Sequence, residues 1–148
     1  MRIKQVHIQN FKAFRECEIL DFDSCNVLIY GNNGSGKSSI YYALHGFLQS
    51  SVKTEEQIQD YFDPANSESI INLYADPGSA SFVRVFTDNG AKYTFAADGD
   101  TRENPTIQLA NLASDFMNFR LLFRFFNVRE AQDADIFPIF FMSSSLIG

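Results

Sequence analysis

The chain of 148 residues contains no tryptophan, two cysteines and two histidines. Cys17 and Cys25 are too few for a disulfide framework, and their spacing is not that of a CxxC metal motif. His7 and His45 are isolated in the sequence, so they suggest no cluster of metal ligands. We therefore expect reduced thiols and no metal site built from these four side chains.

Positive charge is also scarce. The chain has 12 Lys and Arg against 18 Asp and Glu, which gives a formal net charge of −6 and a pI of about 4.8. Contacts with nucleic-acid phosphates require clustered basic residues. The chain by itself is therefore not expected to form a broad nucleic-acid-binding surface.

Long apolar runs are missing as well. No window of about 18 apolar residues could form a membrane-spanning helix. The N-terminal stretch MRIKQVHIQNFKAF has no apolar core of the kind found in signal peptides. The sequence thus predicts a cytoplasmic protein that makes no membrane contact.

Apolar residues nevertheless make up 45% of the chain, and 16 residues are phenylalanine. This content and length suit the core of one domain, and the phenylalanines are expected to fill that core or an interface. Val6 and Ile8 stand two apart within residues 2–9, which predicts a strand. Further β-structure is predicted at 17–22, at 69–75 and in a hairpin over 82–97 with Asn89-Gly90 at or next to its turn. The continuous apolar run Asn26–Tyr30 is typical of a central strand that is covered on both faces.

Three helices are predicted between and after these strands. The first follows the glycine-rich stretch at Gly31 and has an apolar face at helical spacing, formed by Ile40, Ala43, Leu44, Phe47 and Leu48. The second covers Thr54–Phe62, begins with a Thr54/Gln57 capping box and ends before Pro64. The third follows Asn104-Pro105, and its apolar side is predicted to comprise Ile107, Leu109, Leu112, Ala113, Phe116 and Met117 and to continue from Leu121 to Phe126.

The most specific motif is Gly31-Asn32-Asn33-Gly34-Ser35-Gly36-Lys37-Ser38, which matches the phosphate-binding pattern G-x-x-x-x-G-K-[ST]. An apolar run precedes it and an amphipathic helix follows it, as nucleotide-binding loops require. The glycines let the backbone fold around an anion, and the amides of Gly34 to Ser39 are predicted to point at the phosphates. Lys37 supplies a charge for the β- and γ-phosphates, and Ser38 is the expected Mg²⁺ ligand. Ser39 is predicted to give its amide to the α-phosphate, whereas its hydroxyl has the plainer alternative of capping the helix.

Around this motif the stretches IQNFKAFRE, ILDFDS and CNVLIYGNNGSGKSSIYYAL resemble the start of the ATPase head shared by the SMC, RecF, RecN and SbcC proteins. The resemblance is close over about the first 50 residues. The segments that follow, including ASDFMNFRLLFRFF, resemble SMC-like ATPases of bacterial anti-phage systems such as the Lamassu type. The fold class implied is α/β: a P-loop NTPase of the ABC type, with residues 1–148 as its N-terminal lobe and antiparallel strands inserted.

The resemblance implies that ATP and Mg²⁺ are bound between two heads of a homodimer. It implies that Lys37 is catalytic, and that Lys12, the basic residue of the NFK turn, reaches the phosphates. A solvated turn lysine is the alternative for Lys12. Phe14 and Arg15 could lie near the adenine or have no such role. DNA would be bound through other regions.

The chain lacks an L-S-G-G-Q-like signature, an apolar strand ending in Asp-Glu and the late histidine of this family. The resemblance places these in a C-terminal half of the same head, so we expect the chain alone to bind ATP without hydrolysing it. The candidates for the Q-loop residue are Gln108, Asn118, Arg120 and Gln132, and an ordinary surface role is the alternative for each of them. The apolar end, Ile136–Gly148, is expected to pack against the missing half, and the isolated chain is expected to aggregate or fold poorly.

Two functions follow from the sequence. The first is that of an ATP–Mg²⁺-binding half-head which, once completed, hydrolyses ATP to drive action on DNA in anti-phage defence or DNA repair. The second is a nucleotide-dependent interaction module without catalysis. A small P-loop kinase would need an acceptor site and a basic lid, and the sequence suggests neither.

Overall fold

The computed structural model describes residues 1–76 and 78–116. Met1–Ser114 form one compact unit, and the fold described here is that of this unit. The predicted features at Met117, Leu121–Phe126 and Ile136–Gly148 lie outside the described residues. In the described part, no helix is long and apolar enough to cross a membrane.

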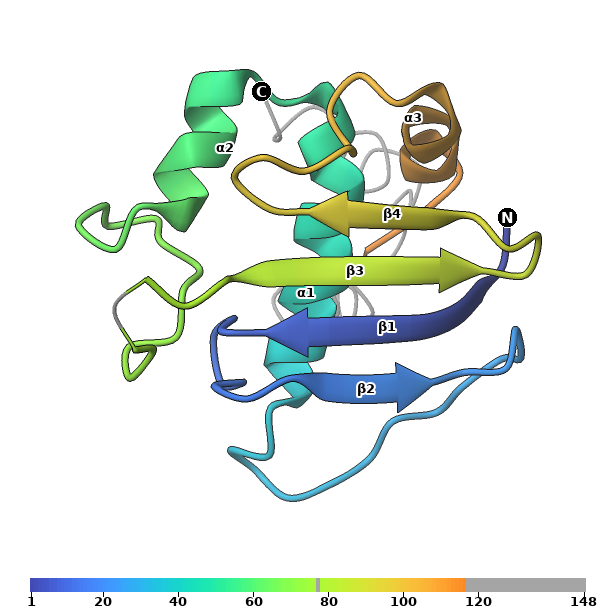
Figure 1. Ribbon diagram of the computed structural model, residues 1–148. Helices are drawn as coiled ribbons and strands as arrows, with labels where there is room; N and C mark the ends of the chain where they lie inside the picture. Colours follow the sequence, from blue (N-terminus) through green and yellow to red (C-terminus); the bar gives the residue numbers. More distant parts are fainter. Residues whose placement is uncertain (77, 117–148) are drawn as a thin grey trace, which may run out of the picture. The chain divides into compact units, whose positions relative to one another are not determined.

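A four-stranded antiparallel sheet forms one layer of the unit (Figure 1). Its order is β2 (Glu18–Asp21), β1 (Ile3–Gln9), β3 (Phe82–Thr87) and β4 (Lys92–Phe95). The predicted strands at 2–9 and 17–22 are therefore confirmed, and so is the hairpin. Its turn carries Asn89-Gly90 and is closed by the Thr87 N–H, which donates to the Ala91 carbonyl at 3.0 Å.

One face of the sheet carries the core. Alternate side chains of a strand point to opposite faces, so the register places Val6 of β1 beside Val85 of β3, and Val83 of β3 beside Phe95 of β4. All four are fully buried. Helix α1 (Lys37–Gln49) packs on this face with the buried side chains of Ile40, Ala43, Phe47 and Leu48, which confirms four of the five residues of its predicted apolar face. The fifth, Leu44, is half-buried.

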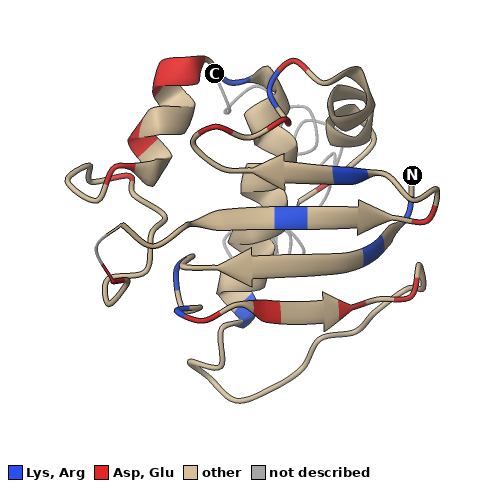
Figure 2. Ribbon diagram, viewed as in Figure 1, with Lys and Arg blue, Asp and Glu red and all other residues tan. Residues whose placement is uncertain are grey.

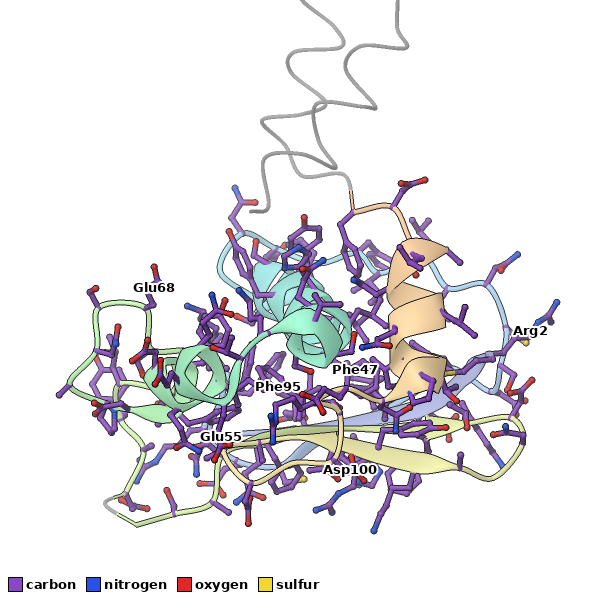
Figure 3. All side chains as sticks on the ribbon, turned by 90° about the horizontal axis from the view of Figure 1, so that it is seen from above. Arg2, Phe47, Glu55, Glu68, Phe95 and Asp100 are labelled. Atoms are coloured by element: carbon purple, nitrogen blue, oxygen red, sulfur yellow. The ribbon has the colours of Figure 1, made fainter. Side chains whose placement is uncertain are left out.

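All three helices lie on the same side of the sheet, and the labelled side chains of Phe47 and Phe95 lie between α1 and the strands (Figure 3). Helix α2 (Glu55–Phe62) begins with the predicted capping box: the Thr54 hydroxyl accepts the Gln57 N–H, and the Gln57 side chain accepts the Thr54 N–H. The rings of Tyr61 and Phe62 meet Phe95 edge to face. The helix ends at Phe62, before Pro64, as predicted.

Helix α3 (Pro105–Leu112) follows β4 in the chain and contacts both α1 and the short 3₁₀ helix η1 (Ser50–Val52). Asn104 caps it by accepting the N–H groups of Thr106 and Ile107. The predicted extension through Ala113 to Phe116 is wrong. The Ser114 hydroxyl donates to the Ala110 carbonyl at the end of the helix. Leu112 is 83% exposed, so no packing of this leucine favours further turns.

The prediction of a buried central strand at Asn26–Tyr30 is also wrong for the described structure. The segment is irregular, and Leu28 and Tyr30 are 88% and 89% exposed. A strand needs neighbours that accept and donate its backbone hydrogen bonds. Among the described residues, no strand pairs with this segment.

The predicted strand at 69–75 is reduced to a single β-bridge between Phe11 and Ile71. The Asn72 side chain accepts the Tyr74 N–H at 2.8 Å, and the Asn72 carbonyl accepts the Ala75 N–H at 3.0 Å. Asparagine side chains compete in this way with the backbone ladder of a strand. The segment therefore turns after Asn72, and the prediction of a strand is wrong.

Candidate functional site

The loop between Gly31 and Lys37 has the backbone shape of an anion cradle. Gly34 and Gly36 have φ angles of 85° and 87°, in the left-handed region that other residues adopt at a cost. Gly36 is also the N-cap of α1, so the helix begins at Lys37 directly beside the loop. The motif predicted from the sequence thus forms a tight loop at a helix N-terminus.

Several backbone donors of this loop are free to bind an anion. Among the described residues, no acceptor is within hydrogen-bond reach of the N–H groups at 33, 34, 36, 37 and 38. The Ser35 N–H donates within the loop to the Asn32 carbonyl, and the Ser39 N–H donates to the Gly36 carbonyl. A helix N-terminus with such donors attracts negative charge through both its hydrogen bonds and its dipole.

The Lys37 side chain folds back over the loop. Its ammonium donates to the carbonyls of Gly31 at 2.7 Å and Asn32 at 2.6 Å, and to the Ser35 hydroxyl at 3.4 Å. These acceptors use the three donors of the ammonium group. A phosphate oxygen that accepts from this ammonium would have to replace one of them.

The turn between β1 and β2 packs against the cradle. The Phe14 ring lies so close to Gly36 that a Cβ there would be 3.2 Å from it. The Ala13 N–H donates to the Ser39 hydroxyl at 3.2 Å, so this buried hydroxyl joins the turn to the first turn of α1. Of the two predicted roles of Ser39, the hydroxyl caps no helix end in the structure.

The Lys12 ammonium lies against the Ser69 carbonyl at 3.5 Å and 5.8 Å from the centre of the Tyr42 ring. Lys12 and Tyr42 also line a pocket of about 260 Å³ together with His45 and Glu68. The Lys12 backbone thus precedes Ala13, which is bonded to Ser39 of α1. The Lys12 side chain lies over Tyr42 of the same helix. Its contact with phosphates stays a prediction.

The other predicted site residues lie in different parts of the chain. Ser38 is exposed at the start of α1, and its role as a Mg²⁺ ligand stays a prediction. Arg15 forms an exposed ion pair with Asp76 at 3.0 Å. Gln108 donates from α3 to the Ser51 carbonyl. The other Q-loop candidates, Asn118, Arg120 and Gln132, lie outside the described residues.

Charged residues are dispersed over the described elements, and basic residues form no broad patch there (Figure 2). In the same part of the chain, no group of three or more His, Cys, Asp or Glu could hold a metal ion. From the described chain, Ser38 is then the predicted ligand of a Mg²⁺ ion that the phosphates would also hold.

The pKa of His45 is held below its usual value, first by burial and next by the charge of Lys53.

Two residues at the site were missed by the sequence analysis. Asn10 is buried with φ 46°, and its side chain donates to the Ser79 hydroxyl and the Ala80 carbonyl, both at 2.8 Å. Asn72 donates from its side chain to the Lys12 carbonyl at 2.6 Å. A signal existed for Asn10, because asparagine tolerates positive φ. Asn72 stood in a predicted strand and gave none.

The chain is similar in sequence to known proteins. Residues 1–134 match a family described as AAA ATPase domain. A structural maintenance of chromosomes protein 3 homolog of Plasmodium falciparum is 32% identical over 93 residues, which are 63% of this chain and 7% of that protein. A DNA replication and repair protein RecF of Chloroherpeton thalassium is 30% identical over 88 residues, which are 58% of this chain and 24% of that protein.

A solved structure reported under "Structural biochemistry of ATP-driven dimerization and DNA stimulated activation of SMC ATPases" is 16% identical and covers 77% of this chain and 81% of its own. Its TM-score of 0.42 is too low to support an argument. The family match covers most of the chain and contains the whole cradle. The chain belongs to the AAA ATPase domain family, and over part of its length it is similar in sequence to an SMC protein and to a RecF protein.

Proposed function

We propose that the loop Gly31–Ser39 binds ATP with Mg²⁺, as the N-terminal half of an SMC-like ATPase head. The observation that carries this proposal is the cluster of backbone N–H groups at 33, 34, 36, 37 and 38, which have no acceptor among the described residues, together with the Lys37 ammonium that lies over the loop. Bound ATP would supply the phosphoanhydride that such heads cleave. The chain's own part is to bind and orient the phosphates.

Each residue of the cradle has a defined task in this proposal. The free N–H groups bind phosphate oxygens, and the helix N-terminus adds its partial positive charge. Lys37 exchanges the carbonyls of Gly31 and Asn32 for β- and γ-phosphate oxygens, which are stronger acceptors because they are charged. The Ser38 hydroxyl holds Mg²⁺. Asn32, Asn33 and Ser35 contribute to the backbone of the loop.

Hydrolysis would need parts that this sequence does not contain, namely a signature loop and an Asp-Glu pair. The chain spans 7% and 24% of the length of the two curated relatives. We therefore assign these parts to a C-terminal half of the head, and place ATP between the heads of a homodimer. The resulting cycle would drive action on DNA through other regions, in anti-phage defence or DNA repair.

The test is Lys37→Ala in the full-length gene product, with ATP binding and turnover both measured. The variant is expected to bind ATP at least about tenfold more weakly, because a charge-assisted contact is lost, and to lose turnover. Lys92→Ala, which removes an exposed lysine of β4, is the matched control and should behave like the wild type. Unchanged turnover in Lys37→Ala would overturn the proposal.

A nucleotide-dependent interaction module is the second candidate function. The absence of an apolar strand ending in Asp-Glu from the 148 residues favours it. In this case the full-length protein would bind ATP through Lys37 and change its association with a partner, with no turnover under any condition. Turnover that depends on Lys37 would exclude it.

A further inference from the structure

The turn between β1 and β2 is held in an unfavourable backbone conformation. Asn10 and Lys12, neither of them glycine, have φ angles of 46° and 49°. Such left-handed conformations cost energy in L-residues, and they persist only where surrounding contacts hold them. The contacts that hold this turn are therefore important for everything the turn supports.

Three of these contacts come from the segment Ile70–Asn72, about 60 residues away in the sequence, and the Asn10 side chain is also bonded to Ser79 and Ala80. The Lys12 N–H donates to the Ile70 carbonyl at 2.7 Å, and the Asn72 N–H donates to the Asn10 carbonyl at 3.1 Å. The Asn72 side chain donates to the Lys12 carbonyl at 2.6 Å. Asn72 thus binds both left-handed residues, and it is only 8% exposed.

The orientation of the Asn72 amide is fixed from both ends. Its oxygen accepts the Tyr74 N–H at 2.8 Å, and its nitrogen donates to the Lys12 carbonyl. A flipped amide would place oxygen against oxygen and nitrogen against N–H, and both bonds would be lost. The side chain therefore has to offer a donor and an acceptor at once, as asparagine does.

The bond to Lys12 extends to the phosphate loop through a single rigid unit. The Lys12 carbonyl and the Ala13 N–H belong to the same planar peptide group. The carbonyl accepts from Asn72, and the N–H donates to the Ser39 hydroxyl in the first turn of α1. One residue further on, the Phe14 ring rests on Gly36. Asn72 thus contacts the same peptide group that is bonded to Ser39.

We propose that Asn72 is a positioning residue for ATP binding. Through the Lys12–Ala13 peptide group it holds the turn against Ser39 and Gly36, and so keeps the loop and the first turn of α1 in the shape proposed above to bind phosphates. It acts through Lys12 and Ala13 and touches no ligand itself. The inference rests on the proposed ATP binding by the same loop.

The test is Asn72→Asp in the full-length gene product. The substitution keeps the size of the side chain and the acceptor for Tyr74, and it places a carboxylate oxygen against the Lys12 carbonyl. The dissociation constant of a fluorescent ATP analogue is expected to rise about tenfold, as for a lost buried hydrogen bond. If the carboxylate prevents folding, Asn72→Ala removes the same donor without adding charge.

Two controls separate positioning from loss of stability. Asn89→Asp makes the same change in the hairpin turn, where the side-chain oxygen accepts the Ala91 N–H and can still do so. Thr101→Val removes the buried bond between Thr101 and the Ser50 hydroxyl, and it should lower the melting temperature without touching the turn. Both are expected to keep wild-type affinity. An Asn72→Asp variant that loses melting temperature like Thr101→Val but keeps its affinity would overturn the inference.

A double-mutant cycle with Ser39→Ala tests the route. Because the two residues act through one peptide group, the double variant is expected to bind no more weakly than the weaker single variant. Fully additive losses would contradict this route. If wild type does not bind the analogue, or binds it equally with Lys37→Ala, both the proposed function and this inference fail. Binding that needs Lys37 but is unchanged in Asn72→Asp overturns the inference alone.

Discussion

The two apolar stretches that flank the phosphate loop have opposite environments. After the loop, α1 buries Ile40, Ala43 and Phe47 against the sheet. Before the loop, Asn26–Tyr30 is equally apolar in sequence, yet Leu28 and Tyr30 are almost fully exposed. Apolar character is thus not sufficient for burial, because a segment also needs a surface to pack on. For α1 that surface is the sheet formed by β1 to β4.

The largest expected effect on stability comes from removing a buried side chain of α1. Phe47 is fully buried between α1 and the sheet. Phe47→Ala should lower the free energy of unfolding of the 148-residue chain by about 3–5 kcal/mol, through lost burial and the cavity left behind. Urea unfolding followed by circular dichroism measures it.

The control for Phe47→Ala is Leu112→Ala in α3, where the side chain is 83% exposed. It should change the free energy of unfolding by less than about 0.5 kcal/mol. Similar losses in the two variants would show that the difference in burial does not decide stability here.

A smaller effect on stability is expected from removing the N-cap of α2, which acts between residues that are close in the sequence. The hydroxyl of Thr54 accepts the Gln57 N–H at the start of α2. Thr54→Ala should cost about 1 kcal/mol of unfolding free energy, as loss of an N-cap does. Thr106→Ala removes an exposed threonine from the first turn of α3 that caps nothing, and it should be close to neutral. Equal losses would mean that the capping box contributes no stability.

The sequence predicted the elements that depend on such local signals. The glycine spacing of the loop, the Thr54/Gln57 pair and Asn89-Gly90 each act within a few residues, and each is found in the structure as predicted. The burial of Asn26–Tyr30 and the end of α3 were not predictable in the same way. Both depend on which other segments are available for packing.

The candidate site likewise combines a motif that the sequence predicted with contacts that it did not predict. The cradle and Lys37 follow from a motif, because the chemistry of phosphate binding fixes residue types at fixed spacing. The bonds of Asn72 to Lys12 and of Ala13 to Ser39 join residues 60 and 26 positions apart. Contacts between such distant residues leave no periodic pattern in a single sequence, so only the structure reveals them.

A pH titration examines the side of α1 that carries His45. Burial, and next Lys53, lower the pKa of His45 below 6.5 in the folded state, and Lys12 and Glu68 line the same pocket. The unfolded chain therefore binds more protons than the folded chain below about pH 6.5. The contribution of neutral His45 to the free energy of unfolding is fully present above that pH, and it should be lost as the pH falls through the folded pKa.

His45→Asn should reduce this pH dependence, measured as the unfolding free energy between pH 7 and pH 5. The remaining slope belongs partly to His7, whose pKa is also lowered by burial and by Arg84, so the double variant with His7→Asn should flatten it further. A slope that is unchanged in both variants would contradict the burial of His45 in the folded chain.

The smallest effect on stability is expected from a change in the exposed segment Asn26–Tyr30. Leu28 is 88% exposed and Leu48 is 7% exposed, so the same change to serine can be made before and after the loop. In the 148-residue chain, Leu28→Ser should alter the free energy of unfolding by less than about 0.5 kcal/mol, whereas Leu48→Ser should cost several kcal/mol. Leu28→Ser should also reduce self-association in analytical ultracentrifugation, because it removes part of an exposed apolar surface. A loss of stability comparable to that of Leu48→Ser would show that Asn26–Tyr30 is packed in the folded chain, and the contrast between the two flanks of the loop would not hold.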